Sequence, residues 1–145
     1  MYGRMMNVKL GEGTTMPSYA HDGDAGLDLR IAENVALKRG GTTTVGLGIA
    51  VEIPHGCVGL LLPRSGLAVN DGVTLTNGVG VIDSGYRGEL QAPLMNIGIH
   101  AAFLPKGTRV CQLVIVPFVP CILTQADELS DTERGCGGFG STGIE

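Results

Sequence analysis

The sequence predicts an all-β fold, a jelly-roll-like β-barrel of short strands with one short helix and a flexible, glycine-rich C-terminal arm. Glycine accounts for 24 of the 145 residues, although 43% of the chain is hydrophobic. Apolar residues occupy every second position over several segments, which is the period of a half-buried strand. Proline and glycine turns separate these segments. Because glycine is unfavourable inside helices, the combination favours a sandwich or barrel.

The alternation locates the expected strands. Every second residue from Val45 to Ile53 is apolar, and Pro-His-Gly follows directly. We expect a hairpin over 45–62, with Pro54 at the second turn position and Gly56 at the fourth. A similar Pro-Lys-Gly turn precedes the last apolar run. The expected strands are 27–31, 45–53, 58–62, 89–97 and 109–118.

One short helix and a C-terminal arm complete the expected organisation. Ser65 is placed to cap a helix that ends near Gly72. After Pro120 the chain becomes polar and acidic, and then rich in glycine, which is unlike a packed strand. We therefore expect a β-barrel domain at 1–123, and a linker and arm at 124–145.

Composition excludes several classes of function. The formal net charge of −4 argues against binding to a nucleic-acid backbone. No apolar run approaches the roughly 18 residues of a membrane span, and the first residues do not resemble a signal peptide, so a cytoplasmic location is expected. The cysteines fit no zinc pattern, and Cys136 is assigned no role. If the ligand is a polyanion, the attraction must come from a few local cations or a metal.

The glycine-rich arm carries the first candidate site. Its G-x-G-x-x-G at 135–140 is not a dinucleotide-binding fingerprint, because that motif follows a strand, opens a helix and precedes an acidic residue about 20 positions on, and only five residues follow Gly140. Glycine N–H groups with Arg134, Ser141 and Thr142 nevertheless suit phosphate, and Phe139 suits stacking on a base. The alternative is a tail without a role.

Two further segments each allow a functional and a structural interpretation. Arg64 beside Ser65 and Gly66 suits an anion, although an ordinary helix cap with a solvated arginine explains the same residues. Asp83 suits an acid–base group and Tyr86 a packing surface for a ligand. The alternative is a turn with a rim aromatic and an Arg87–Glu89 ion pair.

Two polar residues lie in predicted strands. Asp28 occupies the polar phase of its strand, where a solvent-facing carboxylate is the simplest interpretation. Gln112 interrupts an apolar strand and therefore needs a hydrogen-bond partner, which can be structural.

Together, and in this order, five segments resemble the motifs of the trimeric dUTPase (deoxyuridine 5'-triphosphate nucleotidohydrolase) family. An ordered set spread along the chain is far more specific than a single glycine signature. The segments are AGLDLRIA at 25–32, PRSGLA at 63–68, NGVGVIDSGYRGE at 77–89, GTRVCQLV at 107–114 and RGCGGFGSTG at 134–143.

The resemblance implies a jelly-roll homotrimer with active sites at subunit boundaries, each closed by an arm from a neighbouring chain. Such an enzyme hydrolyses dUTP to dUMP and pyrophosphate with Mg²⁺, which removes dUTP and supplies dUMP for thymidylate synthesis. Water attacks the α-phosphorus in line with the leaving pyrophosphate. Nucleic acid and membranes are not expected partners.

The resemblance also implies roles for particular residues. Asp83 orients and deprotonates the attacking water, and a tight hairpin at 77–91 reads uracil and excludes a 5-methyl group. Asp28 reaches the metal indirectly, through water. The nucleoside-binding residues are Asn77, Val81, Ile82, Tyr86, Gln91 and Phe139, and the phosphate-binding residues are Arg64, Ser65, Gly66, Gln112, Arg134, Gly140, Ser141 and Thr142.

Departures from the family pattern are small. Cys136 stands where a polar or acidic residue is more frequent, and Val79 where proline is frequent; neither removes a functional group. Two alternatives remain open. A dCTP deaminase-like relative has the same core fold but needs an additional acid–base group, and a nucleotide-sensing regulatory trimer needs no catalysis.

Overall fold

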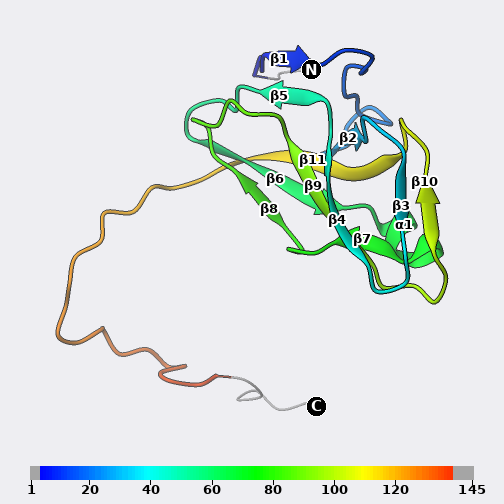
Figure 1. Ribbon diagram of the computed structural model, residues 1–145. Helices are drawn as coiled ribbons and strands as arrows, with labels where there is room; N and C mark the ends of the chain where they lie inside the picture. Colours follow the sequence, from blue (N-terminus) through cyan, green and yellow to red (C-terminus); the bar gives the residue numbers. More distant parts are fainter. Residues whose placement is uncertain (1–3, 139–145) are drawn as a thin grey trace.

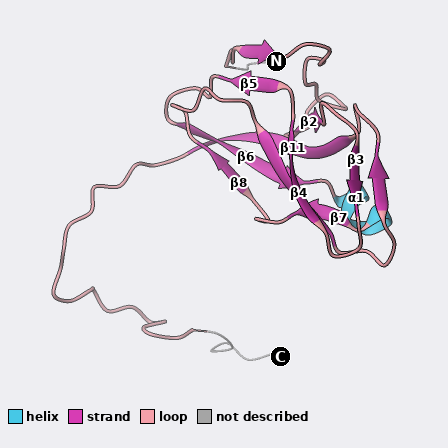
Figure 2. Ribbon diagram, viewed as in Figure 1, coloured by secondary structure: helices cyan, strands magenta, loops and turns pink. Residues whose placement is uncertain are grey.

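The computed structural model describes residues 4–138 and confirms an all-β fold with one short helix in that range (Figures 1 and 2). The strands are short, as the frequent turns predict. The elements are β1 (Val8–Leu10), β2 (Leu27–Arg30), β3 (Val35–Leu37), β4 (Thr42–Gly46), β5 (Ile49–Val51), β6 (Cys57–Pro63), α1 (Ser65–Asp71), β7 (Val73–Leu75), β8 (Gly80–Ile82), β9 (Gln91–Asn96), β10 (Ala102–Leu104) and β11 (Arg109–Pro117).

The strands pair into four sheets over the described residues. The largest has the order β2-β11-β6-β8, the next β4-β9-β7, and the pairs β1-β5 and β10-β3 lie beside them. All pairings are antiparallel. One apolar cluster joins the two larger sheets, because Val45 and Leu94 of the second sheet pack with Leu61 and Leu113 of the first.

The expected hairpin over 45–62 is wrong. The extended conformation is interrupted between β4 and β5, where Gly48 has a φ of +65° that other residues rarely adopt. β5 then pairs with β1, whereas β6 pairs with β11 and β8. The alternation was correct for burial, but alternation does not identify the pairing partner.

The turn after β5 exists, but its residues occupy other positions than expected. The N–H of Cys57 donates to the carbonyl of Pro54 at 3.0 Å. Pro54 is therefore first and Gly56 third in the turn, where the φ of +77° of Gly56 is required.

The segment 77–91 does not form a self-paired hairpin within the chain. β7 pairs with β9 across it, and β8 leaves this sheet to pair with β6. The connection therefore links the two larger sheets and leaves Asp83 directly after β8.

Helix α1 follows β6 after one residue. Arg64 keeps the extended conformation of the strand and is the N-cap, so Ser65 is the first helical residue rather than the cap that we expected. Gly72 ends the helix in the left-handed region, with a φ of +67°, as expected.

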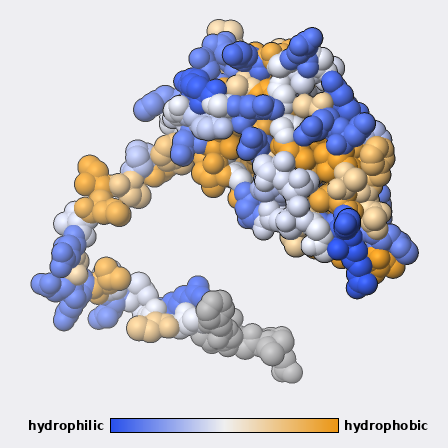
Figure 3. All heavy atoms as spheres, in the orientation of Figure 1, coloured by the Kyte–Doolittle hydropathy of each residue, from blue (hydrophilic) through white to orange (hydrophobic). Residues whose placement is uncertain are grey.

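Beyond β11 the chain leaves the folded body (Figure 1), and residues 118–136 are exposed. Among its exposed apolar side chains are Phe118, Ile122 and Leu123, and Figure 3 shows apolar side chains along this segment. The boundary at residue 123 remains a prediction. Over residues 4–138 the chain has no helix long and apolar enough to cross a membrane.

We predict that Val73→Ala destabilises the fold by about 1.5–3 kcal/mol, because Val73 is 1% exposed and its removed methyl groups leave a cavity. Val69→Ala is the matched control, since Val69 is 82% exposed, and its effect should stay within about 0.5 kcal/mol. Urea denaturation at a fixed protein concentration measures both. Equal effects of the two substitutions would contradict the core assignment.

Candidate functional site

A cavity of about 500 Å³ lies where β2, β6 and β11 meet the start of α1. Three of the segments that carry family motifs contribute to its wall, although they are far apart in the sequence. The lining includes Asp28, Arg64, Ser65, Gly66 and Gln112. The structure thus brings together the phosphate-binding residues expected from these segments.

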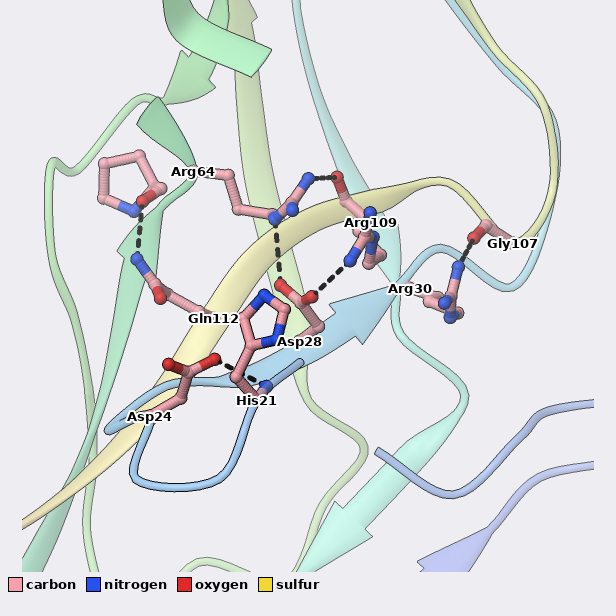
Figure 4. Close-up of polar contacts among 9 residues, drawn as sticks. His21, Asp24, Asp28, Arg30, Arg64, Gly107, Arg109 and Gln112 are labelled. Carbon is pink, nitrogen blue, oxygen red and sulfur yellow. Dashed lines mark hydrogen bonds and ion pairs between the residues drawn. The ribbon is translucent and has the colours of Figure 1, made fainter. Parts of the chain in front are cut away.

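Asp28 lines this cavity and forms ion pairs with two arginines (Figure 4). Arg64 Nε donates to Asp28 Oδ1 at 2.9 Å, and Arg109 Nη1 donates to Oδ2 at 2.8 Å. The Asp28 side chain is only 14% exposed, so the solvent-facing interpretation is wrong. Its strand position was correct, but neighbouring side chains cover it.

Gln112 lies on β11 directly opposite Asp28. Its Nε2 donates to the carbonyl of Pro63 at 3.3 Å, which is the partner that a polar residue in an apolar strand needs. A Cβ at Gly26 would overlap Gln112 Oε1. Glycine at position 26 therefore makes room for the amide oxygen beside the cavity.

The buried thiol of Cys111 lies next to Asp28 and Arg64 and is unreactive. Burial, and to a smaller extent the negative charge of Asp28, raise its pKa from 9.0 to about 12, against a lowering by Arg64. The reactive form of cysteine is the thiolate. Cys111 is therefore a neutral packing residue and not a nucleophile.

Ser65 and Gly66 begin α1 and are exposed at the cavity. N–H groups in the first turn of a helix have no acceptor within the helix. The start of α1 thus presents polar groups beside Arg64, an arrangement that suits an anion.

The loop after β8 is fixed by hydrogen bonds although it is exposed. The Tyr86 hydroxyl donates to the carbonyl of Glu89 at 3.0 Å, and Arg87 Nη1 donates to the carbonyls of Ser84 and Tyr86 at 2.7 and 2.9 Å. These bonds shape the loop that begins at Asp83.

The alternative of an Arg87–Glu89 ion pair is wrong. Arg87 Nε lies 3.6 Å from Glu52 Oε1, and the Glu89 carboxylate accepts the N–H of Gly48 at 2.8 Å. Both interactions tie the loop to the segment around β5.

Asp83 does not line this cavity of its own chain. Ile82, its neighbour, pairs with Gly59, whereas Arg64 follows the opposite end of β6. At about 3.3 Å per residue, the five steps between positions 59 and 64 span roughly 16 Å. The structure therefore separates two groups of expected site residues within one chain.

None of the expected nucleoside-binding residues that the structure describes lines this cavity. Ile82 is half-buried, and the others that the structure describes are exposed. They are Asn77, Val81, Tyr86 and Gln91.

Arg134 lies in the extended arm, where its Nε donates to the carbonyl of Gly137 at 3.1 Å. It is therefore not at the cavity of its own chain. Phe139, Gly140, Ser141 and Thr142 lie outside the described residues.

Arg109 contacts the site but was not among the expected site residues. A sequence signal was available, because Val110 and Cys111 are consecutive apolar residues that break the alternation of β11. Over residues 4–138, no group of three or more histidine, cysteine or acidic side chains could hold a metal.

Comparison with known proteins identifies the family. A family model described as dUTPase matches residues 12–143. The chain belongs to the dUTPase family. The deoxyuridine 5'-triphosphate nucleotidohydrolase of Clostridium kluyveri is 43% identical over 93% of this chain and 94% of its own length. That of Thermobifida fusca is 46% identical over 93% of this chain and 76% of its own length.

Solved structures of the dUTPase family share the fold. A mutant dUTPase of Staphylococcus bacteriophage 80alpha, solved with dUpNHpp, has a TM-score of 0.92 and 32% identity, covering 98% of this chain and 100% of that one. A mutant dUTPase from phage phi11 of S. aureus, described with a structural Mg(II) ion, has a TM-score of 0.80 and 30% identity, covering 86% and 98%.

We predict that Cys111→Ala weakens the loss of stability at alkaline pH. The folded chain keeps this thiol protonated up to about pH 12, whereas the unfolded chain ionises it near 9.0. Its contribution is therefore complete below pH 9 and is lost as the pH rises toward 12. Urea denaturation between pH 8 and 11, with reductant, should give a shallower decline for the variant than for the wild type. Cys121→Ala, at an exposed thiol, should follow the wild type.

Proposed function

We propose that the chain hydrolyses dUTP to dUMP and pyrophosphate in a homotrimer whose sites combine residues of neighbouring subunits. The activity follows from membership of the dUTPase family. The observation that carries the mechanism is the cavity that gathers Arg64, Ser65, Gly66 and Gln112. In this proposal it receives the triphosphate.

Local charge supports the placement of the triphosphate. The protein as a whole has a net charge of −4 and repels a polyanion at long range. At the cavity, two guanidiniums face one carboxylate, which leaves a local positive charge. Phosphoryl transfer depends mainly on such positioning and charge stabilisation.

In the proposed mechanism, Asp83 orients the attacking water and accepts its proton as the oxygen bonds to the α-phosphorus. The bond from the α-phosphorus to the bridging oxygen breaks, and pyrophosphate leaves opposite the water. Asp83 is exposed at the end of β8 and is free to face another subunit. The separation of Asp83 from the cavity of its own chain supports the trimer, because a neighbouring subunit must then supply the cavity.

The nucleoside is proposed to bind along the segment 77–91, where backbone groups read uracil. Asn77, Val81, Ile82 and Gln91 border it, and Tyr86 packs on the deoxyribose. The hydrogen bond from the Tyr86 hydroxyl to the Glu89 carbonyl holds the Tyr86 ring in place. A close fit excludes a methyl group by steric conflict, whereas attraction to one methyl gives only about 1–3 kcal/mol.

The arm is proposed to close over a site of the trimer, with Phe139 stacking on uracil and Arg134 reaching the terminal phosphate. Gly140, Ser141 and Thr142 supply further donors. The exposed, extended course of residues 118–136 supports this reach. Closure excludes water and strengthens the charge contacts.

Mg²⁺ fits this site only through water and the substrate. Both Asp28 oxygens already accept from arginine, and each retains one lone pair that a water molecule can use. Asp28 and Gln112 would then hold waters of the metal shell, and phosphate oxygens would be the direct ligands. When bound, the ion offsets the negative charge of the phosphates.

The defining experiment is pyrophosphate release from a panel of deoxynucleoside triphosphates, with and without Mg²⁺. We expect that dUTP is the only nucleotide of the panel to release pyrophosphate. The release should be faster with Mg²⁺ than without it. Ammonia release from dCTP would instead identify a deaminase, and nucleotide binding without turnover would identify a sensing trimer.

We predict that Asp83→Asn lowers kcat by on the order of 10²–10⁴-fold while dUTP binding persists, because the amide cannot accept the proton. Steady-state hydrolysis and binding of a non-hydrolysable dUTP analogue measure the two effects. Asp127→Asn, at an exposed carboxylate, is the control and should leave kcat unchanged. An unaltered kcat in Asp83→Asn would refute the base assignment.

We predict that removal of residues 134–145 lowers kcat strongly and leaves the trimer intact, because none of residues 118–136 contributes to the core. Hydrolysis assays and sedimentation velocity test the two parts separately. Monomers in the truncated protein, or full activity, would argue against an arm that only closes the site.

A further inference from the structure

The bulge in β11 directs Arg109 toward the site. Arg109 is opposite Arg30 of β2, whereas Cys111, two residues later, is opposite Leu29, one residue earlier. Val110 is therefore an additional residue in β11. Val110 and Cys111 are both buried, at 1% and 0% exposed. Two consecutive buried residues show that the alternation of the strand shifts by one position here.

This shift decides which face carries the guanidinium. In an unbroken strand, Arg109 would share the face of Cys111 and Leu113, both of which are buried in the apolar core. An unpaired charge there would be strongly unfavourable. The bulge instead places Arg109 on the face of Gln112, where it reaches Asp28.

Arg64 is the residue held by this arrangement. Its Nε donates to Asp28 Oδ1 at 2.9 Å, and its Nη1 donates to the Arg109 carbonyl at 3.4 Å. Arg109 thus acts on Arg64 twice, through the carboxylate that it shares and through its own backbone. Among the described residues, Arg64 Nη2 has no hydrogen-bond partner, and the residue lines the cavity.

We propose that Arg109 is a positioning residue, which acts through Asp28 to hold Arg64 in the orientation that binds a substrate phosphate. This inference rests on the proposed function. Asp28 alone would draw Arg64 away from a phosphate, because their opposite charges would largely cancel. With Arg109 the cluster keeps one net positive charge. Arg64 is also ordered before binding, which reduces the entropy that phosphate binding must overcome.

The test separates phosphate binding from nucleoside binding. Arg109→Gln should raise KM for dUTP, and Kd for a non-hydrolysable dUTP analogue, by on the order of tenfold, the effect of a lost hydrogen bond to a charged group. The affinity for deoxyuridine, which has no phosphate, should not change. Arg39→Gln removes an exposed positive charge elsewhere and should leave all three values unchanged.

A double substitution tests the route through Arg64. If Arg109 acts through Arg64, Arg64→Gln with Arg109→Gln should bind the analogue within about twofold of Arg64→Gln alone. Should Arg109→Gln fail to fold in a melting assay, Arg109→Lys keeps a cation near Asp28 without the planar fork. It should then show an intermediate loss for the analogue and none for deoxyuridine.

Two results would overturn the inference while dUTP hydrolysis by the wild type persists. One is an equal loss of affinity for deoxyuridine and the analogue, and the other is a multiplicative loss in the double variant. Absence of hydrolysis in the wild type would overturn the proposed function itself.

Discussion

The carboxylate of Asp28 is the interaction on which the candidate site depends. It links three strands, because it lies on β2 and accepts from the arginine that follows β6 and from the arginine that begins β11. At 14% exposed it is screened less by water than the surface pair of Arg87 and Glu52. Removal of the carboxylate would leave two neighbouring guanidiniums without the negative charge that they share.

The second constraint is the direction of β6. One end of this strand leads into Arg64 and α1, and its middle pairs with β8, which runs away from that end and leads into Asp83. A straight strand cannot bring its two ends together. The proposed chemistry therefore requires a second subunit, and the β-strands provide rigid positions for both groups of residues. Assembly and catalysis then depend on the same geometry.

The sequence was most informative where a local pattern was sufficient. The alternation at 27–31 located β2, the β-branched run at 109–118 located β11, and Gly72 marked the end of α1. It was misleading at 45–62, because period two identifies buried faces but not strand partners. Arg109 was missed for a related reason. The two consecutive apolar residues that follow it were the sequence signal of a bulge, and the register against β2 establishes that this bulge turns Arg109 to the polar face.

The sequence by itself determined the fold class, the family and the types of chemical group available, because turn residues, alternation and ordered motifs are local properties. The tertiary structure decided which of these groups meet. It paired Asp28 with two arginines that lie 36 and 81 positions away along the chain, and it separated Asp83 from the cavity. Contacts over such distances depend on sheet pairing and register, which the packing of the whole chain fixes.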